Sequence, residues 1–117
     1  MAVRKATDAE LRILIHANEK VVVKFTKKDC VICERMGVTY SRLSEEKEFK
    51  DITFLLMDAI ENPVSAKEVH LTGTPFFAIY QKGFLTKCKL ISVEDELIDF
   101  LHELLSNSHN FKTSYPV

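Results

Sequence analysis

The chain has 117 residues and carries 16 basic and 17 acidic side chains, so its formal net charge is −1. This near balance argues against a general nucleic-acid or membrane-surface binder, since both classes usually carry a basic excess. The length fits one compact domain, which can bury a sizeable core without disulfide bonds or structural zinc. No apolar run approaches the ~20 residues that span a bilayer, and the N-terminus lacks the apolar stretch of a signal peptide, so we expect a cytoplasmic protein.

The N-terminal part of the chain predicts a helix, a strand and a second, longer helix. Residues 7–10 match a capping box, and the apolar spacing that follows extends the first helix to about Ala17. The β-branched run at 21–25 predicts a strand that is buried on both faces, as in a parallel sheet. After a polar loop, helical spacing runs from about residue 31 to 47, and Gly37 is expected to weaken or bend this helix.

A second buried strand and a short helix occupy the middle of the chain. The apolar run at 52–57 predicts the strand, and Asp58 ends it. Asn62-Pro63 is typical of a helix start, with Asn62 as the N-cap and Pro63 at the first helical position. The alternation of strands and helices up to this point predicts parallel crossover connections.

The C-terminal part predicts a hairpin and a last helix. Residues 76–80 form the first strand of the hairpin, Lys82-Gly83 the tight turn, and residues 85–91 the antiparallel partner. Ser92 can then cap the last helix, whose acidic first turn suits the positive helix end. The buried stripe of this helix comprises Leu97, Leu101 and Leu104, widened by Ile98 and Leu105.

The order of these elements predicts an α/β fold with a mixed sheet of about four strands and about four flanking helices. The chain has no internal repeat, linker or low-complexity segment, so residues 1–117 are expected to form a single domain and a monomer. The core is expected to span about residues 5–105, and the polar tail at 106–117 to be frayed or loosely docked.

Two of the cysteines form a Cys-x-x-Cys motif, Cys30-Val31-Ile32-Cys33. Two intervening residues on the first turn of a helix place the sulfurs close enough for a disulfide. The helix N-terminus also stabilises a thiolate on the first sulfur, because unpaired N–H groups and the helix dipole favour negative charge there. Cys30 is therefore the expected nucleophile, and Cys33 the cysteine that resolves a mixed disulfide. The pair itself is the redox centre, so no other cofactor is expected.

Other interpretations of the cysteines stay open at this point. A zinc site needs four ligands, and two unremarkable buried cysteines are the structural alternative. The third cysteine, Cys88 in the predicted last strand, is expected to be a small packed residue or a half-exposed thiol. No metal is expected, because none of the four histidines shows the spacing of a zinc ligand: His16, His70, His102 and His109.

Four local features occur in order along the chain. The strand at 21–25 leads into Cys-x-x-Cys, and the strand at 54–58 ends in an aspartate. The loop at 72–76 reads Thr-Gly-Thr-Pro-Phe, and Lys82-Gly83 forms the hairpin turn. Together these features resemble the thioredoxin family, over about residues 5–105. The resemblance implies the thioredoxin fold and a dithiol that exchanges disulfides with other proteins.

The resemblance also implies a substrate-binding surface around the cysteine pair. In the family, the proline that corresponds to Pro75 follows a cis peptide bond and faces the cysteines. The residue before it, here Thr74, presents its backbone to a bound peptide as a short antiparallel strand. With Val31 and Ile32, these residues are the expected substrate contacts. The alternative is a trans proline that opens an edge strand.

The residues around the motif depart from the family pattern. Thioredoxin usually has tryptophan before the first cysteine, where this chain has Asp29, and the chain has no tryptophan. Asp29 opposes ionisation of Cys30, whereas Lys27 and Lys28 favour it, and all three are expected to be solvated loop charges. The family's buried acid corresponds to Lys24, and the lysine partner of that acid corresponds to Phe54, so the usual proton relay is absent.

Three interpretations of Lys24 compete. The simplest is that the side chain snorkels, with its stem buried and its amine at the sheet edge. The amine can instead lie near Cys33 and stabilise the thiolate as a cation, or it can be desolvated and act as a base.

Three functions follow from these residues. The first is a protein-disulfide oxidoreductase whose partners are protein dithiols or disulfides and an electron donor, either a reductase or a glutathione-type system. The second is a non-catalytic thioredoxin-fold adaptor, which the missing relay, the missing tryptophan and the apolar Val31-Ile32 pair favour. The third is a glutathione-linked, glutaredoxin-like enzyme, which the Thr74-Pro75 loop permits.

Overall fold

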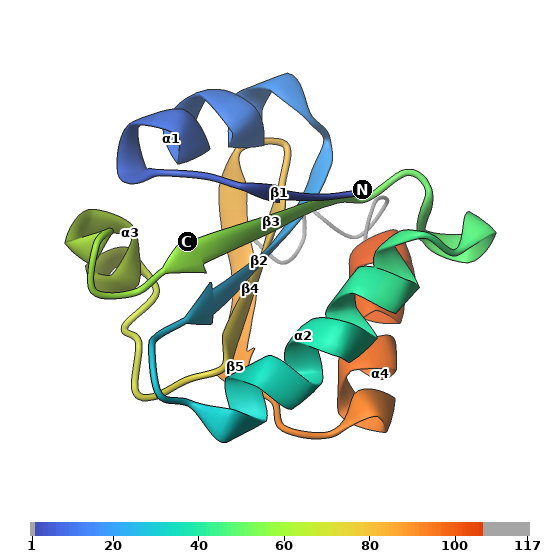
Figure 1. Ribbon diagram of the computed structural model, residues 1–117. Helices are drawn as coiled ribbons and strands as arrows, with labels where there is room; N and C mark the ends of the chain where they lie inside the picture. The colour runs from blue at the N-terminus through green and yellow to red at the C-terminus, as the bar shows by residue number, and fades with distance from the viewer. Residues whose placement is uncertain (1, 107–117) are drawn as a thin grey trace.

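Five strands form one sheet in the part of the chain that the computed structural model describes, residues 2–106 (Figure 1). The sheet is mixed, because β1 and β2 run parallel to β3 while β4 runs antiparallel to β2 and β5. The predicted α/β architecture is therefore confirmed. The strands, in sheet order, are β1 (Val3–Lys5), β3 (Thr53–Asp58), β2 (Lys20–Thr26), β4 (Phe76–Gln81) and β5 (Phe84–Leu90).

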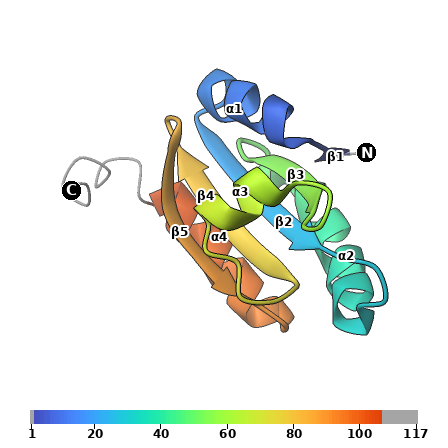
Figure 2. The same cartoon turned by 90° about the vertical axis from the view of Figure 1, so that its left-hand side faces the viewer.

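Helices cover both faces of this sheet (Figures 1 and 2). Helices α1 and α3 lie on one face, and α2 and α4 lie on the other. The helix that was predicted to reach Lys47 ends at Ser44, and a short 3₁₀ helix follows it. No helix in the described range is long and apolar enough to cross a membrane. The helices are α1 (Asp8–Ala17), α2 (Val31–Ser44), η1 (Lys47–Phe49), α3 (Pro63–Glu68) and α4 (Glu94–Ser106).

The strand that the sequence did not predict is β1, which adds a fifth strand at the sheet edge. Val3 is its one apolar residue, and Arg4 and Lys5 are exposed. A three-residue strand with two charges has no alternating pattern to detect. It also blunts the edge of the sheet, because short, charged edge strands resist pairing with other chains.

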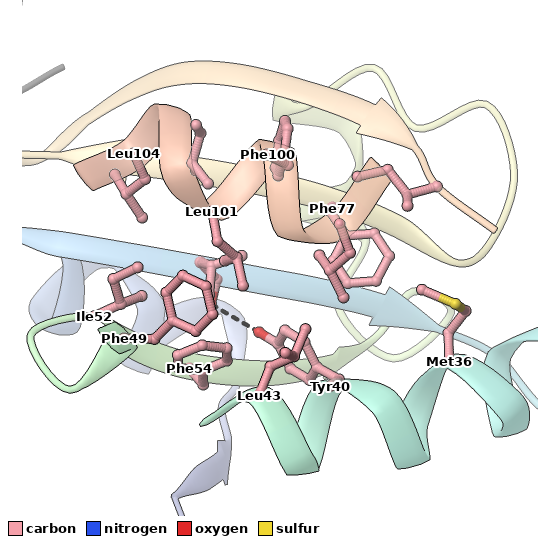
Figure 3. Packing of buried hydrophobic residues seen from close by; sticks show 14 residues of the cluster. Met36, Tyr40, Leu43, Phe49, Ile52, Phe54, Phe77, Phe100, Leu101 and Leu104 are labelled. Atoms are coloured by element: carbon pink, nitrogen blue, oxygen red, sulfur yellow. Dashed lines mark hydrogen bonds between the residues drawn. The ribbon is translucent and has the colours of Figure 1, made fainter. Parts of the chain in front are cut away.

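The core between the sheet and helices α2 and α4 is organised around Tyr40 (Figure 3). Its ring lies 5.2 Å from that of Phe54 and 5.6 Å from that of Phe77. Its hydroxyl donates to the carbonyl oxygens of Val22 and Leu55, at 3.0 and 2.8 Å. These contacts hold α2, the helix that begins beside the cysteines, on β2 and β3. Burial raises the pKa of Tyr40 well above its usual value, so the phenol stays protonated.

On the opposite face, Asp8 joins the start of α1 to the start of α3. Its carboxylate accepts hydrogen bonds from the backbone N–H groups of Val64 and Ser65, at 3.1 and 2.8 Å. Asn62 is the N-cap residue of α3, as predicted, but its side chain makes no capping hydrogen bond. Its Oδ1 accepts from the Asp8 N–H and its Nδ2 donates to the Asp58 carbonyl. A residue 55 positions before Pro63 therefore caps this helix, which local sequence patterns cannot reveal.

The hairpin turns at the predicted residues. Lys82 and Gly83 both have positive φ, 52° and 88°, as a two-residue type I′ turn requires. A Cβ on Gly83 would lie 2.9 Å from the His16 ring, so glycine is also needed for space. Strand β5 begins at Phe84, one residue earlier than predicted.

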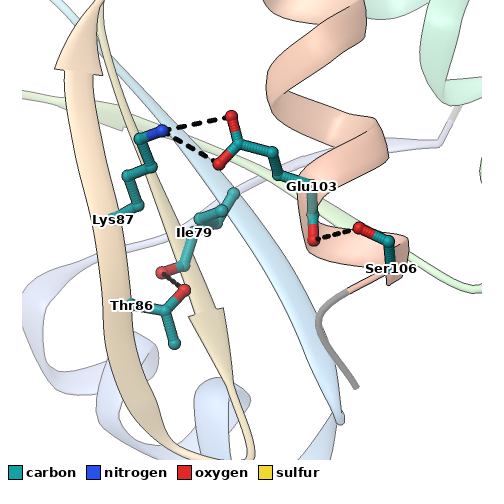
Figure 4. Close-up of polar contacts among 5 residues, drawn as sticks. All are labelled: Ile79, Thr86, Lys87, Glu103 and Ser106. Atoms are coloured by element: carbon teal, nitrogen blue, oxygen red, sulfur yellow. Dashed lines mark hydrogen bonds and ion pairs between the residues drawn. The ribbon is translucent and has the colours of Figure 1, made fainter. Parts of the chain in front are cut away.

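Strand β5 and helix α4 are tied together by a surface ion pair between Lys87 and Glu103, at 2.9 Å (Figure 4). The predicted Ser92 cap of α4 is wrong, because the helix begins two residues later, at Glu94. Glu94 instead pairs with Arg42 of α2 at 2.7 Å. The acidic first turn complements the helix dipole at that end.

Candidate active site

The two cysteines of the motif occupy the start of α2, where they form a disulfide. Cys30 is the N-cap residue and Cys33 lies one turn inside, with their Cα atoms 5.2 Å apart. The backbone N–H of Cys33 donates to Cys30 Sγ at 3.2 Å. In the reduced protein the same N–H would face a thiolate, as the helix position predicts.

The two sulfurs differ in exposure. Cys33 is 2% exposed, whereas Cys30 is partly exposed. An incoming disulfide can therefore reach Cys30 directly but cannot reach Cys33.

The loop before β4 comes to the same place from far along the chain. The Thr74 hydroxyl lies 3.7 Å from Cys30 Sγ, and the Thr74 carbonyl oxygen lies 3.8 Å from it. The Thr74–Pro75 peptide bond is cis. Strand β4 pairs with β2, whose carboxyl end leads to Cys30, and this pairing brings Thr74 beside the pair. The loop and the motif, separate in the sequence, thus form one site.

Apolar side chains are exposed beside the sulfurs. Val31 is 75% exposed and Ile32 is 39% exposed, while Thr74 and Pro75 are partly exposed. The structure therefore brings all four predicted substrate contacts to the surface around Cys30.

Asp29 precedes Cys30 in an unusual backbone conformation, with φ of 59°. Aspartate tolerates this left-handed region better than most residues do, because its short side chain can hydrogen-bond locally. Lys27, Lys28 and Asp29 are all exposed, so they form the charged loop that the sequence predicts.

Lys24 is buried on β2, next to the Cys30–Cys33 disulfide. It is 3% exposed, so the prediction that its amine snorkels to the sheet edge is wrong. Its Nζ donates to the backbone carbonyl oxygen of Cys33 at 2.7 Å. Burial lowers the pKa of Lys24 to about 8, because the charged amine has lost its water.

Sequence reasoning missed the part that Gly37 has in this arrangement. A Cβ on Gly37 would lie 3.2 Å from the Lys24 Nζ, so the glycine leaves room for the amine. Helix α2 continues through Gly37 to Ser44. The detectable signal was its place four residues after Cys33, on the same side of the helix.

Cys88 belongs to a different part of the molecule. It lies on β5, packs against the cluster under α1 and α3, and places its Sγ 3.4 Å from the Val69 carbonyl oxygen. It is a free, half-buried thiol, as predicted, and burial raises its pKa. Within residues 2–106 no group of three or more His, Cys, Asp or Glu side chains is arranged to hold a metal ion. His109 lies outside the described residues.

Known proteins are similar to this chain in sequence and in fold. A protein-family model described as Thioredoxin matches residues 2–103. Mitochondrial thioredoxin-3 of Saccharomyces cerevisiae is 33% identical over 76 residues, which are 65% of this chain and 58% of that protein. Protein disulfide-isomerase 1 of Caenorhabditis elegans is 30% identical over 83 residues, which are 69% of this chain and 17% of the isomerase. The chain thus spans less than two thirds of the length of these relatives.

Solved structures agree with the fold. The oxidised form of yeast mitochondrial thioredoxin 3 superposes with a TM-score of 0.79 at 28% identity, covering 87% of this chain and 95% of that one. Spinach chloroplast thioredoxin f superposes with a TM-score of 0.82 at 24% identity, covering 90% and 95%, and supports the fold alone. Because the family model covers most of the residues and the cysteine pair lies at the start of α2, the chain belongs to the thioredoxin family.

Proposed function

We propose that the chain is a thiol–disulfide oxidoreductase that acts on protein disulfides through Cys30 and Cys33. The observation that carries the proposal is the asymmetry of the pair, with Cys30 partly exposed at the helix N-cap and Cys33 buried behind it. One sulfur is accessible to a substrate, and the other is held for an intramolecular step.

The exchange runs in two steps. The Cys30 thiolate attacks one sulfur of a substrate disulfide, the substrate S–S bond breaks, and the other substrate sulfur leaves as a thiolate. Cys33, after losing its proton, then attacks Cys30 Sγ, and the second substrate sulfur leaves as a thiolate. The substrate gains two electrons and the pair becomes the Cys30–Cys33 disulfide. A dithiol or glutathione-type donor must return two electrons for the next cycle.

The surroundings of Cys30 favour the first step. The Cys33 N–H at 3.2 Å and the Thr74 hydroxyl at 3.7 Å both lie where they can stabilise negative charge on Sγ. The substrate segment is proposed to pair with the backbone at Thr74 and to pack on Val31, Ile32 and Pro75.

The proposal is tested by insulin disulfide reduction with dithiothreitol as electron donor. Cys33→Ser should lose turnover but retain a covalent substrate adduct at Cys30, which non-reducing gels and mass spectrometry would detect. Cys88→Ser is the matched control and should keep wild-type activity, because that thiol lies on the other face of the sheet. Absence of both turnover and adduct would overturn the proposal.

An adaptor function is the second candidate, and one observation favours it. Val31 exposes 75% of its surface between the two cysteines, which suits an apolar partner site. An adaptor would retain its partner when both cysteines are replaced by serine, whereas an oxidoreductase would lose its covalent adduct. The third candidate, a glutathione-linked enzyme, predicts a mixed disulfide between Cys30 and glutathione after incubation with oxidised glutathione. A cytoplasmic location and a monomeric state stay predictions from the sequence.

A further inference from the structure

Lys24 is a buried amine without a carboxylate partner among the described residues. Its neighbours across the sheet are apolar, Leu56 on β3 and Phe77 on β4. None of the ion pairs among residues 2–106 includes Lys24. A buried cation without a counter-charge is unfavourable, because the backbone carbonyl that it contacts replaces only part of its lost hydration.

Titratable groups near Lys24 lie on α2 and β3. Asp58 lies two positions after Leu56 on β3, on the same face of the sheet, but its carboxylate accepts hydrogen bonds from the Ile60 and Glu61 N–H groups. The Lys24 Nζ contacts the Cys33 carbonyl oxygen, and Cys30 is bonded to Cys33. Tyr40, the next titratable group on the buried side of α2, directs its hydroxyl to other carbonyl oxygens and stays protonated. None of the acidic residues of α4, the other helix on this face, is buried: Glu94, Asp95, Glu96 and Asp99 are exposed, and Glu103 is partly exposed.

The charge balance at this place therefore depends on the redox state of the pair. In the disulfide, neither sulfur carries charge, and the Lys24 ammonium is uncompensated. In the reduced pair, a thiolate supplies a negative charge on Cys33, whose carbonyl oxygen the ammonium contacts, or on its neighbour Cys30. An opposite charge at short range in a low-dielectric site stabilises both ionised groups.

We propose that Lys24 is a positioning residue whose ammonium is the buried counter-charge of the reduced Cys30–Cys33 pair, so that reduction of the pair and charging of Lys24 favour each other. The inference rests on the proposed function only in that the pair cycles between disulfide and dithiol. It specifies how this chain can regulate that cycle without a buried acid.

Reduction of the pair is coupled to the protonation state of Lys24. A dithiol reductant gives two electrons to the pair, the Cys30–Cys33 S–S bond breaks, and the reductant becomes a disulfide. One of the reductant's two protons goes to the pair, and the destination of the other depends on Lys24. When the amine is already charged, one proton goes to one cysteine, the other cysteine remains a thiolate, and the second proton is released to solvent. When the amine starts neutral, it takes up that second proton.

Because burial lowers the pKa of Lys24 to about 8 in the oxidised protein, the amine is charged below that pH and neutral above it. The thiolate of the reduced pair raises the proton affinity of the amine. Between about pH 8 and the higher pKa of the reduced form, reduction should therefore take up one more proton than in a chain without the amine.

Lys24→Met tests the inference, because methionine keeps the length of the side chain and removes the charge. In the reduced variant, thiolate absorbance at 240 nm should titrate about one pH unit higher than in the wild type. At pH 7, the redox equilibrium with glutathione should shift toward the disulfide by about tenfold, which is the same free-energy change expressed as an equilibrium constant. The extra proton uptake above pH 8 should disappear.

Two further variants test whether the effect depends on where the positive charge lies. Lys28→Met removes an exposed lysine beside the same motif and should change the redox equilibrium by less than about twofold, because solvent screens its charge. Gly37→Ala keeps Lys24 but places a methyl group 3.2 Å from its Nζ, so it should move the thiolate titration in the direction of Lys24→Met.

Urea unfolding is measured for each variant, and Lys24→Met should be at least as stable as the wild type, because it removes an unpaired buried charge. A Lys24→Met variant that folds, with an unchanged thiolate titration and redox equilibrium, overturns the inference. Wild-type protein that fails to reduce insulin but shows the predicted shift overturns the proposed function and supports the inference.

Discussion

The Thr74 hydroxyl lies 3.7 Å from Cys30 Sγ, although the two residues are 44 positions apart in the chain. It is the side chain through which the loop before β4 reaches the exposed sulfur. A hydroxyl in that position stabilises the thiolate more than the thiol, because a hydrogen bond to an ionised acceptor is the stronger one.

Replacing Thr74 by valine should therefore raise the pKa of Cys30 in the reduced protein. A rise of about one unit corresponds to about tenfold less thiolate at a pH below both pKa values. Alkylation of Cys30 by iodoacetamide, followed against pH in a Cys88→Ser background, measures this shift. Thr72→Val, an exposed position in the same loop, is the control. Equal pH profiles for the two variants would show that the Thr74 hydroxyl has no such role.

The buried hydroxyl of Tyr40 should contribute more to stability than that of Tyr80. Tyr40 donates to two backbone carbonyl oxygens, whereas the Tyr80 hydroxyl has no partner among the described residues. Tyr40→Phe should lower the free energy of unfolding by about 1–2 kcal/mol, and Tyr80→Phe should leave it unchanged or raise it. Urea unfolding of both variants measures the difference. A larger loss for Tyr80→Phe would contradict this account of the core.

The sequence predicted the parts of the site that depend on local chemistry. The Cys-x-x-Cys spacing, the β-branched strand before it and the Lys82-Gly83 turn each have a local physical cause, and each is present in the structure. The buried position of the Lys24 amine has no such local cause. Whether a lysine in a buried strand reaches water depends on the helix packed above it, and here Gly37 of that helix leaves space for the amine.

The same limit applies to the group that caps α3. The position of Asn62 directly before a proline is typical of an N-cap, and the pattern correctly located the start of α3. The cap itself comes from Asp8, which reaches α3 only because α1 and α3 pack on one face of the sheet. Hydrogen bonds between distant segments are determined by the tertiary fold, so a local pattern can locate a helix start without identifying what caps it.

Asp8 should make the stability of the fold depend on pH in the acidic range. Burial raises the pKa of this carboxyl, but hydrogen bonds from Ser65 and Val64 outweigh that effect, and the pKa is lowered overall. A carboxyl with a lower pKa in the folded state stabilises the protein above its unfolded pKa, near 3.8, and loses that contribution as the pH falls through the folded pKa.

The thermal unfolding temperature of the wild type should therefore fall more steeply between pH 5 and pH 3 than that of Asp8→Asn. The variant should also be less stable at pH 7, by about 1 kcal/mol, because an amide caps the helix less well at its positive end. Asp51→Asn, at an exposed position, controls for the loss of one negative charge. The same flattening in Asp51→Asn would mean that overall charge, and not the contact with α3, causes the pH dependence.

The glycine of the hairpin turn should be less replaceable than the glycine of the loop before β4. Gly83 has φ of 88°, and a Cβ there would lie 2.9 Å from two atoms of the His16 ring. Gly73 does not have positive φ, and a Cβ there would meet only the end of the Leu90 side chain, at 3.5 Å. Gly83→Ala should cost about 1–2 kcal/mol from the left-handed backbone alone, with more from the ring.

Gly73→Ala should be close to neutral or slightly stabilising, because alanine restricts the unfolded chain. Urea unfolding distinguishes the two variants, and His16→Ala in the Gly83→Ala background separates the two causes. If the double variant recovers part of the loss, the ring contact contributes, and the remainder belongs to the backbone. An equal loss of unfolding free energy in Gly73→Ala and Gly83→Ala would contradict the type I′ turn, because that turn requires positive φ at Gly83 and nothing requires it at Gly73.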